Sequence, residues 1–389
     1  MIYNKLGSMK KRLEGFKLGW YLIGVSILCL FKIGFAYYAC NGFAFGDWLI
    51  NYQDGGFKRR GLLGTVFVFF YNSFSIKLQY SVFVAQAIVY ILFFYFLSLL
   101  FKLKQTNLID VFLFLTPFCL WGFLSDAAIG CRKDGILWLL FSIFAYFLIK
   151  NKFSGFRENI LLISFSLSIF IHESFIFYAP YFLFILFLHN RKLDIQKTLK
   201  ILLAFYIPGV FIFFLGNMNP DYGYTLRLIN ECGINLQDQN IFQWKENELI
   251  KTKYYLENIN TISLYLVSFT LQVFFILYYI FLIKKNELSN KKLLLIAFFI
   301  LIISTIPLFL IAIDIGRWLY NHFILFFIIL IFQLPDRKGE MKIMDRSLLN
   351  YKNIIFLSLV LIADFIYRVP SYELGIDMGL PLKFLLKFF

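Results

Sequence analysis

Two carboxylates and three consecutive cations lie within one short polar segment near the N-terminus. Asp47 and Asp54 precede Lys58, Arg59 and Arg60, and glycines stand on both sides of the cations. Cations in a glycine-rich segment suit a bound phosphate or pyrophosphate, because glycine lets the backbone approach a ligand closely. The carboxylates would then act as a base or pair with the cations. The alternative is a surface cluster that meets lipid headgroups.

A second charged cluster separates two apolar stretches further along the chain. Asp126 is followed within nine residues by Arg132, Lys133 and Asp134. Charges this close to apolar stretches indicate mutual pairing or a buried ligand. Arg132 is suited to bind two phosphate oxygens at once, with Lys133 beside it and Asp134 orienting the guanidinium. The alternative for Asp134 is a simple cap at the start of the next helix.

His172 and Glu173 form a polar pair between two strongly apolar stretches. Such a pair needs polar partners or a water-filled cavity. Imidazole has the free pKa nearest to neutrality, which makes His172 a candidate general base that removes a proton from a sugar hydroxyl. Glu173 would orient or stabilise the imidazole. The alternative is a structural histidine at a turn.

A fourth cluster contains Asp314, Arg317 and Trp318. Arg317 is a further candidate ligand for phosphate, with Asp314 beside it, and the alternative is an ordinary helical ion pair between the two. Trp318 would stack on a sugar or a polyprenyl chain, or belong to the aromatic belt at the membrane interface. The sequence contains neither a phosphate-binding loop of the ATPase type nor a serine-hydrolase elbow, which argues against both classes.

These clusters interrupt a chain that is too apolar for a soluble protein. Of its 389 residues, 60% are hydrophobic and 16% charged, and the mean hydropathy is +0.73. The net charge of +15 fits basic cytoplasmic loops near anionic lipid, so we expect no nucleic-acid partner. Five cysteines without a C-x-x-C pair and only three histidines predict no metal site.

Apolar stretches of membrane-spanning length recur along the chain. The stretch 62–79 is short and interrupted, which predicts an interfacial or re-entrant helix. The stretch 159–189 is either one long helix or a hairpin with its turn at His172. The nine plain spans are 18–38, 80–101, 108–125, 135–149, 199–216, 261–283, 293–313, 318–333 and 353–369.

The positive charges decide between the two readings of 159–189. The hairpin places most of the 38 Lys and Arg residues on one side of the membrane, as the positive-inside rule requires. We therefore predict an all-α polytopic membrane protein of about eleven spans, with the N-terminus inside and the C-terminus outside. It forms one transmembrane domain, residues 1–389, and all four clusters face outward. The external loops are 39–61, 126–134, 217–260 and 314–317.

The motifs GGFKRRGLLG, GCRKDG, IHES and DIGRW, with this layout, resemble the O-antigen and capsular repeat-unit polymerases of the Wzy type. These are glycosyltransferases of the bacterial inner membrane that use undecaprenyl diphosphate-linked oligosaccharides, together with a flippase and a chain-length regulator. The related ligases work without metal, which implies no cofactor here. The resemblance assigns the pyrophosphate to Arg59, Arg60, Arg132 and Arg317, and the base to His172, with Asp47 or Asp54 in reserve. The long external loop, residues 217–260, does not match the pattern of the corresponding loop in the ligases.

Two other classes of membrane protein remain as alternatives. A polyprenyl-phosphate-sugar transferase with a GT-C-like fold would use a carboxylate in the first external loop, here Asp47 or Asp54, and a divalent cation. A flippase or transporter would place paired charges on inverted repeats in the middle of the membrane. The sequence shows no such repeat, and its charges gather at one face.

Overall fold

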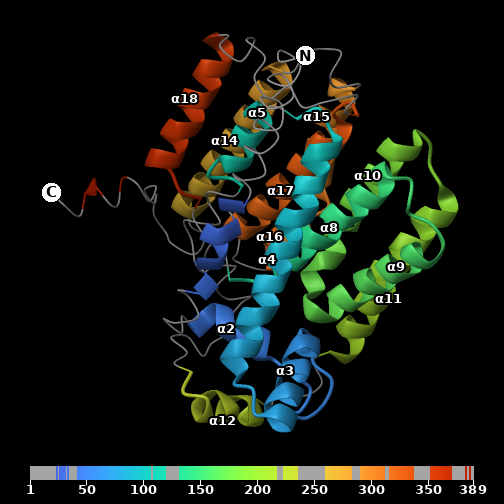
Figure 1. Ribbon diagram of the computed structural model, residues 1–389, viewed down its shortest axis with the longest axis vertical. Helices are drawn as coiled ribbons and strands as arrows, with labels where there is room; N and C mark the ends of the chain where they lie inside the picture. The colour runs from blue at the N-terminus through green and yellow to red at the C-terminus, as the bar shows by residue number, and fades with distance from the viewer. Residues whose placement is uncertain are drawn as a thin grey trace, which may run out of the picture.

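The computed structural model describes residues 42–106, 108–119, 131–216, 222–234, 259–282, 290–311, 315–336 and 351–369, with a few positions in 23–34 and 382–386. Almost all of this part is helical, without a β-strand (Figure 1). The helices are α2 (Gly42–Leu49), α3 (Gly61–Phe74), α4 (Leu78–Leu103), α5 (Leu108–Leu115), α8 (Asp134–Ile149), α9 (Gly155–Ile171), the 3-10 helix η1 (Glu173–Tyr178), α10 (Ala179–Asn190), α11 (Ile195–Leu215), α12 (Gly223–Glu231), α14 (Ile259–Leu282), α15 (Lys291–Ile303), α16 (Ile306–Ile311), α17 (Ile315–Gln333) and α18 (Tyr351–Ile366).

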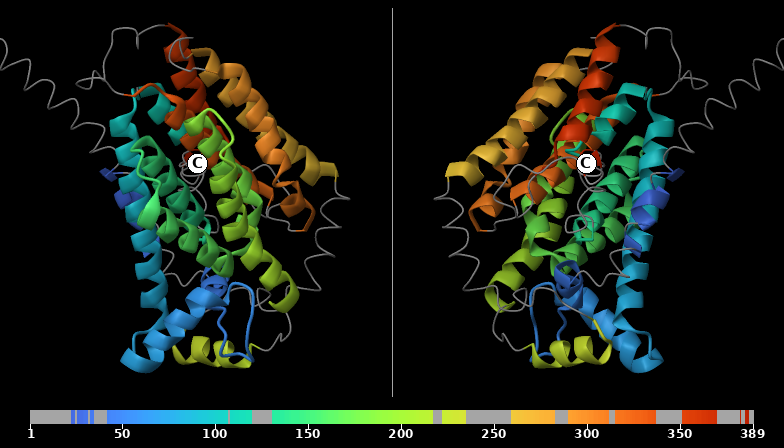
Figure 2. Two further views of the ribbon diagram at one scale, coloured as in Figure 1. Left: turned by 90° about the vertical axis from the view of Figure 1, so that its right-hand side faces the viewer. Right: turned by 90° about the vertical axis from the view of Figure 1, so that its left-hand side faces the viewer.

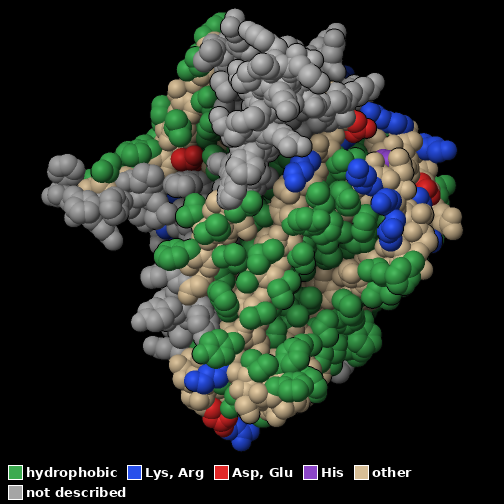
Figure 3. All heavy atoms as spheres, in the orientation of Figure 1, with side chains coloured by type: hydrophobic (Ala, Val, Ile, Leu, Met, Phe, Trp, Pro, Cys, Tyr) green, Lys and Arg blue, Asp and Glu red, His purple; other side chains and the backbone are tan. Residues whose placement is uncertain are grey.

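Four of the described helices are long and apolar enough to cross a membrane. They are α4, α11, and the segments Ile262–Leu282 of α14 and Gly316–Gln333 of α17. Large apolar side chains point outward from α4, α11 and α14, such as Phe213 on α11, which is 80% exposed. Figure 3 shows hydrophobic side chains over the middle of the molecule. So large an apolar surface is typical of a membrane-facing protein, and the chain is an all-α membrane protein, as its composition predicts.

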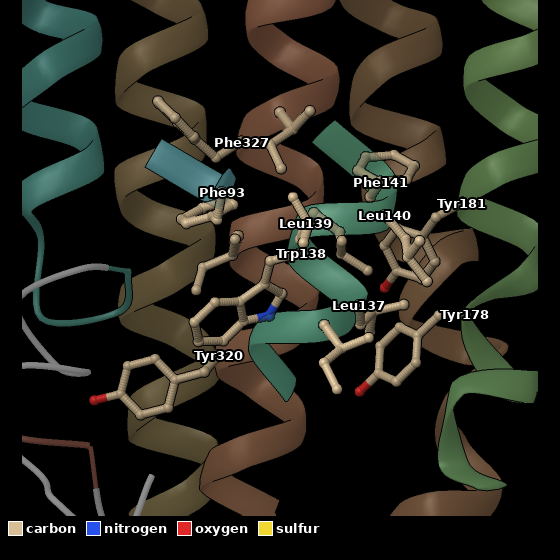
Figure 4. Close-up of a cluster of buried hydrophobic side chains, with 14 of the residues drawn as sticks. Phe93, Leu137, Trp138, Leu139, Leu140, Phe141, Tyr178, Tyr181, Tyr320 and Phe327 are labelled. Carbon is tan, nitrogen blue, oxygen red and sulfur yellow. The ribbon is translucent and has the colours of Figure 1, made fainter. Parts of the chain in front are cut away.

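Helix α17 runs through the interior of the bundle and is buried along its length. A helix that is apolar on every side is stable only where other helices surround it, and α17 contacts α8, α10, α14 and α15. Figure 4 shows the packing around Trp138 of α8, between Phe93 and Tyr178. The indole N–H of Trp138 donates to Oδ1 of Asn321 on α17 at 2.8 Å, which fixes α8 against α17.

The stretch 159–189 is broken at His172, as the hairpin interpretation predicts. Helix α9 ends at Ile171, η1 follows, and α10 begins at Ala179. After α10 the chain comes back beside the start of α9, where Nζ of Lys197 donates to the carbonyl oxygen of Phe153 at 3.4 Å. His172 therefore lies at the opposite end of this helix pair.

Two predicted spans are shorter than expected, each next to a proline. The predicted span 293–313 is divided into α15 and α16 at residues 304–305, two residues before Pro307. The predicted span 108–125 begins as α5, which ends two residues before Pro117, and residues 120–130 lie outside the described part. Proline has no N–H to donate and its ring collides with the carbonyl group four residues earlier, which ends a regular helix.

Helix α3 occupies most of the segment that we predict to be interfacial or re-entrant. It has 14 residues, about 21 Å at 1.5 Å per residue, too short to span a bilayer. The chain turns at Ser75 and α4 begins at Leu78. A Cβ atom at Gly64 would lie 2.0 Å from the carbonyl oxygen of Ile50, so only glycine lets α3 lie this close to the end of α2. In Figures 1 and 2, α3 and α12 lie together at one end of the bundle.

The other end of the bundle carries a polar pocket. Lys104, Asn151, Arg191 and Asp336 line it, close to the C-terminal ends of α4, α8, α10 and α17. Nζ of Lys104 lies 2.7 Å from the carboxylate of Asp336. These segments are the ones that the charge rule places together on the inner side.

Candidate functional site

Five segments that are distant in the sequence meet at the end of the bundle opposite the polar pocket. They are α2, the loop that leads into α3, the start of α8, the junction between α9 and η1, and the start of α17. These segments carry the residues that sequence analysis singles out in all four clusters. Asp126 and Asp314 lie outside the described residues.

Arg60 joins the first cluster to the third. Its Nη1 donates to Oδ1 of Asp47 at 3.0 Å, while its Nη2 and Nε donate to the two carboxylate oxygens of Glu173 at 2.7 and 2.8 Å. Arg60 has a φ of 63°, in the left-handed region that non-glycine residues rarely adopt. Such strained backbone is typical of functional sites, where surrounding contacts hold it in place. Here the contacts to both carboxylates do so.

Lys133 brings the second cluster to the same carboxylate. Its Nζ lies 3.8 Å from Oδ2 of Asp47 and donates to the carbonyl oxygens of Arg60 and Ile171 at 3.4 and 3.3 Å. Burial lowers the pKa of Lys133 to about 8, although the charge of Asp47 acts in the opposite direction. Burial would raise the pKa of Asp47, but Lys133 and Arg60 outweigh it and hold that pKa well below its ordinary value. Asp47 is therefore ionised at neutral pH.

Asp134 connects the second cluster to the fourth. Its Oδ2 lies 3.8 Å from Nη1 of Arg317, and its Oδ1 accepts a hydrogen bond from Nδ2 of Asn321 at 2.6 Å. The carboxylate thus lies against Arg317, a partner that the sequence does not predict. Its side chain does not cap α8, whose N-cap residue is Lys133. Asn321 was missed in the sequence, because one asparagine inside an apolar helix has no local motif.

Trp318 and Arg132 are both buried in the interior. The guanidinium carbon of Arg317 lies 4.2 Å from the centre of the Trp318 ring, a cation–π contact. Trp318 is only 1% exposed, so it does not belong to an interfacial aromatic belt. Arg132 is 4% exposed, and its charge contributes to the low pKa of Asp47.

His172 is fully buried, and its imidazole makes its polar contacts with Ser174. Nδ1 accepts the backbone N–H of Ser174 at 3.3 Å and lies 2.7 Å from its hydroxyl oxygen. The ring stacks on Phe175, while Nε2 is buried without a hydrogen-bond partner. Burial and the charge of Arg60 hold the pKa of His172 well below its ordinary value. The carboxylate of Glu173 is bound to Arg60, and also lies 3.6 Å from Nη1 of Arg59.

Asp54 and Lys58 hold a segment of the long external loop. Asp54 accepts the backbone N–H of Thr225 at 3.0 Å and also binds the Thr225 hydroxyl. Asn51 donates to the same hydroxyl oxygen at 2.6 Å, and Nζ of Lys58 lies 4.0 Å from the centre of the Tyr222 ring. These contacts fasten α12 across the end of the bundle. Sequence analysis missed the contribution of Thr225, because its partners lie more than 170 residues away.

Many charged side chains lie together in the described part of this end of the bundle. The cationic ones are Lys58, Arg59, Arg60, Arg132, Lys133 and Arg317, and the carboxylates are Asp47, Asp54, Asp134 and Glu173. Several cations gathered in a largely buried setting favour the binding of an anion. The arrangement is thus suited to a ligand that carries several negative charges. Among the described residues, no group of three or more His, Cys, Asp and Glu side chains lies close enough to hold a metal ion.

Comparison of the chain with protein-family models, with curated proteins and with solved structures gives no match.

Proposed function

We propose that the protein is a glycosyltransferase of the bacterial inner membrane that polymerises oligosaccharide repeat units linked to undecaprenyl diphosphate. The observation that carries this proposal is that cations from all four clusters come together at one end of the bundle, largely buried. A diphosphate leaves readily only when its growing negative charge is neutralised, and fixed guanidinium groups in a low-dielectric site can do this. The proposed fold has about eleven spans, with α3 at the interface, in a GT-C-like arrangement.

The reaction joins two lipid-linked glycans. A sugar hydroxyl of the acceptor forms a new bond to the anomeric carbon of the donor, and the bond from that carbon to the diphosphate oxygen breaks. The electron pair leaves with undecaprenyl diphosphate, which Arg59, Arg132 and Arg317 stabilise. The proton of the hydroxyl passes to a base. Among the described residues, several buried polar atoms of the site are without a hydrogen-bond partner, and two of them, Oδ2 of Asp47 and Nε2 of His172, belong to residues that the sequence predicts as the base.

Deleting the gene in the organism that carries it tests this proposal. We expect surface glycan that consists of a single repeat unit, because assembly and export of that unit do not need the polymerase. Plasmid-borne wild-type protein should restore long chains. Long chains in the deletion strain, or complete loss of the glycan, would contradict the proposal.

A second candidate is a GT-C transferase that uses a polyprenyl monophosphate sugar. The observation that favours it is the position of Asp47, a fully buried carboxylate in the first external segment. A divalent cation would then be needed beside Asp47. Activity with monophosphate donors that is lost on adding a chelator would identify this class.

A further inference from the structure

The polar contacts of His172 fix where its ring carries a proton. A backbone N–H can only donate, so the contact from Ser174 N–H to Nδ1, at 3.3 Å, requires a lone pair on Nδ1. His172 is the N-cap residue of η1, and its side chain takes the acceptor role of that position. A neutral imidazole has one donor and one acceptor nitrogen. With Nδ1 as the acceptor, the proton must lie on Nε2.

Nε2–H is then a buried donor without an acceptor among the residues that the structure describes. The side chain of His172 is 0% exposed, and Nε2 has no hydrogen-bond partner in this part of the chain. An unsatisfied buried donor costs about 1–3 kcal/mol, which a ligand acceptor would recover. The ring of His172 lies close enough to this cluster for the charges of Arg60, Glu173 and Asp47 to act on it.

We propose that His172 is a neutral hydrogen-bond donor to a diphosphate oxygen of the lipid-linked substrate, and that Asp47 is the base. This inference rests on the function proposed above and reverses the role that the sequence suggests for His172. A neutral imidazole donates without adding a further positive charge to a site already rich in cations. Its Nδ1 is occupied by Ser174 and its Nε2 holds a proton, so neither nitrogen is free to take one from the acceptor hydroxyl. Of the two candidate atoms named above, Oδ2 of Asp47 is left to take that proton.

Nitrogen NMR of histidine-labelled protein in lipid nanodiscs tests the position of the proton directly. The chain has only three histidines, so His189→Gln and His322→Gln variants assign the signals of His172. At neutral pH we expect a protonated signal for Nε2 and an unprotonated one for Nδ1. The opposite pattern would overturn the inference.

The same sample tests the contact with substrate. Adding undecaprenyl diphosphate should shift the Nε2 signal of His172 and leave the signals of His189 unchanged, because His189 lies at the other end of the bundle. A protonated Nε2 that responds neither to the diphosphate nor to the monophosphate would also overturn the inference. A response to the monophosphate lipid alone would contradict the diphosphate assignment.

The transfer rates of two His172 variants show whether this residue acts as a hydrogen-bond donor or as a base. His172→Gln keeps an N–H donor and an acceptor for Ser174, so we expect most of the transfer rate to remain. His172→Phe keeps a flat ring but removes the donor, and removal of one such donor lowers the rate by about 10²–10³. If His172 were the base, both variants would lose the transfer activity to the same extent. His189→Gln, at the other end of the bundle, is the control and should stay within a few-fold of wild type.

The failure of this inference can be told from the failure of the proposed function. If the nanodisc protein transfers no sugar from diphosphate donors but Nε2 still responds to undecaprenyl diphosphate, the polymerase is wrong and the binding contact stands. If transfer occurs and His172→Gln is as inactive as His172→Phe, with both variants at wild-type abundance, the polymerase stands and the donor role is wrong.

Discussion

Arg60 contacts two carboxylates with different edges of its guanidinium. Nε and Nη2 hold Glu173, and Nη1 holds Asp47. A lysine has one compact ammonium group on a flexible stem and does not reproduce a planar fork. Arg59 contacts the same carboxylate of Glu173 at 3.6 Å, beyond hydrogen-bond distance.

Arg60→Lys should therefore lower both stability and activity. Loss of one hydrogen bond to a charged group costs about 1.5–3 kcal/mol of unfolding free energy, which a thermal-shift measurement on detergent-purified protein would detect. Arg59→Lys is the matched control, and we expect it to lower stability less, because its contact with Glu173 is longer. Equal stability of the two variants would contradict the central position of Arg60.

Lys133 gives the site a pH dependence on the alkaline side. Its pKa is lowered to about 8 by burial, against about 10.4 in an unfolded chain. Between these values the folded state binds fewer protons than the unfolded state, so the contribution of Lys133 to stability rises with pH. Its positive charge, however, is lost above pH 8. If that charge helps to hold the diphosphate, the transfer rate should decline above about pH 8, and a flat pH–rate profile to pH 10 would contradict this role.

At the level of elements, α12 is positioned by the loop that precedes α3. Asp54 binds both the backbone N–H and the hydroxyl of Thr225, which fixes the first turn of α12. Gln79 at the start of α4 donates to the carbonyl oxygen of Cys232 at 2.6 Å and holds the other end. Helix α12 is thereby fastened beside the candidate site.

This position gives Asp54 a role different from that of Asp47. Asp54→Ala should release α12, so that limited proteolysis cuts near residue 225 sooner than in the wild type, while transfer falls only several-fold. Asp47→Ala should leave the proteolysis pattern unchanged and abolish transfer. Complete loss of transfer in Asp54→Ala with an intact α12 would instead make Asp54 a candidate base.

The sequence could predict which segments meet but not which atoms bind. Apolar length and positive charge were enough to predict the helix break at His172 and the grouping of the clusters at one end. The helices next to Pro117 and Pro307 are shorter than predicted, because the prediction relied on the length of the apolar stretches and gave too little weight to proline. The pairings of Asp134 with Asn321 and of Asp54 with Thr225 depend on three-dimensional packing over more than 170 residues. Local spacing carries no signal for such contacts.

The molecule as a whole has two polar ends separated by apolar helices. Lys104, Asn151 and Arg191 lie at one end, whereas Arg60, Lys133 and His172 lie at the other. This separation agrees with a membrane protein whose chemistry takes place at one membrane face. The segments that we predict to be inner loops lie together at the end with the polar pocket.

Cysteine labelling in intact cells tests this arrangement. Single cysteines at Asn151 and Asn190 should share one pattern of access to a membrane-impermeant reagent, because both lie at the end with the polar pocket. A cysteine at the exposed Ser75, beyond the end of α3, should show the opposite pattern. The same pattern at all three positions would contradict the two-ended topology.

The most direct test of the central claim compares two donor lipids on one purified protein. In nanodiscs, the protein should join synthetic oligosaccharides linked to undecaprenyl diphosphate, releasing undecaprenyl diphosphate as longer glycans form. Arg132→Lys and Arg317→Lys should slow this reaction strongly, and the same glycans on undecaprenyl monophosphate should not react. Transfer from the monophosphate lipid alone, or full activity in both arginine variants, would contradict a site built to bind the diphosphate.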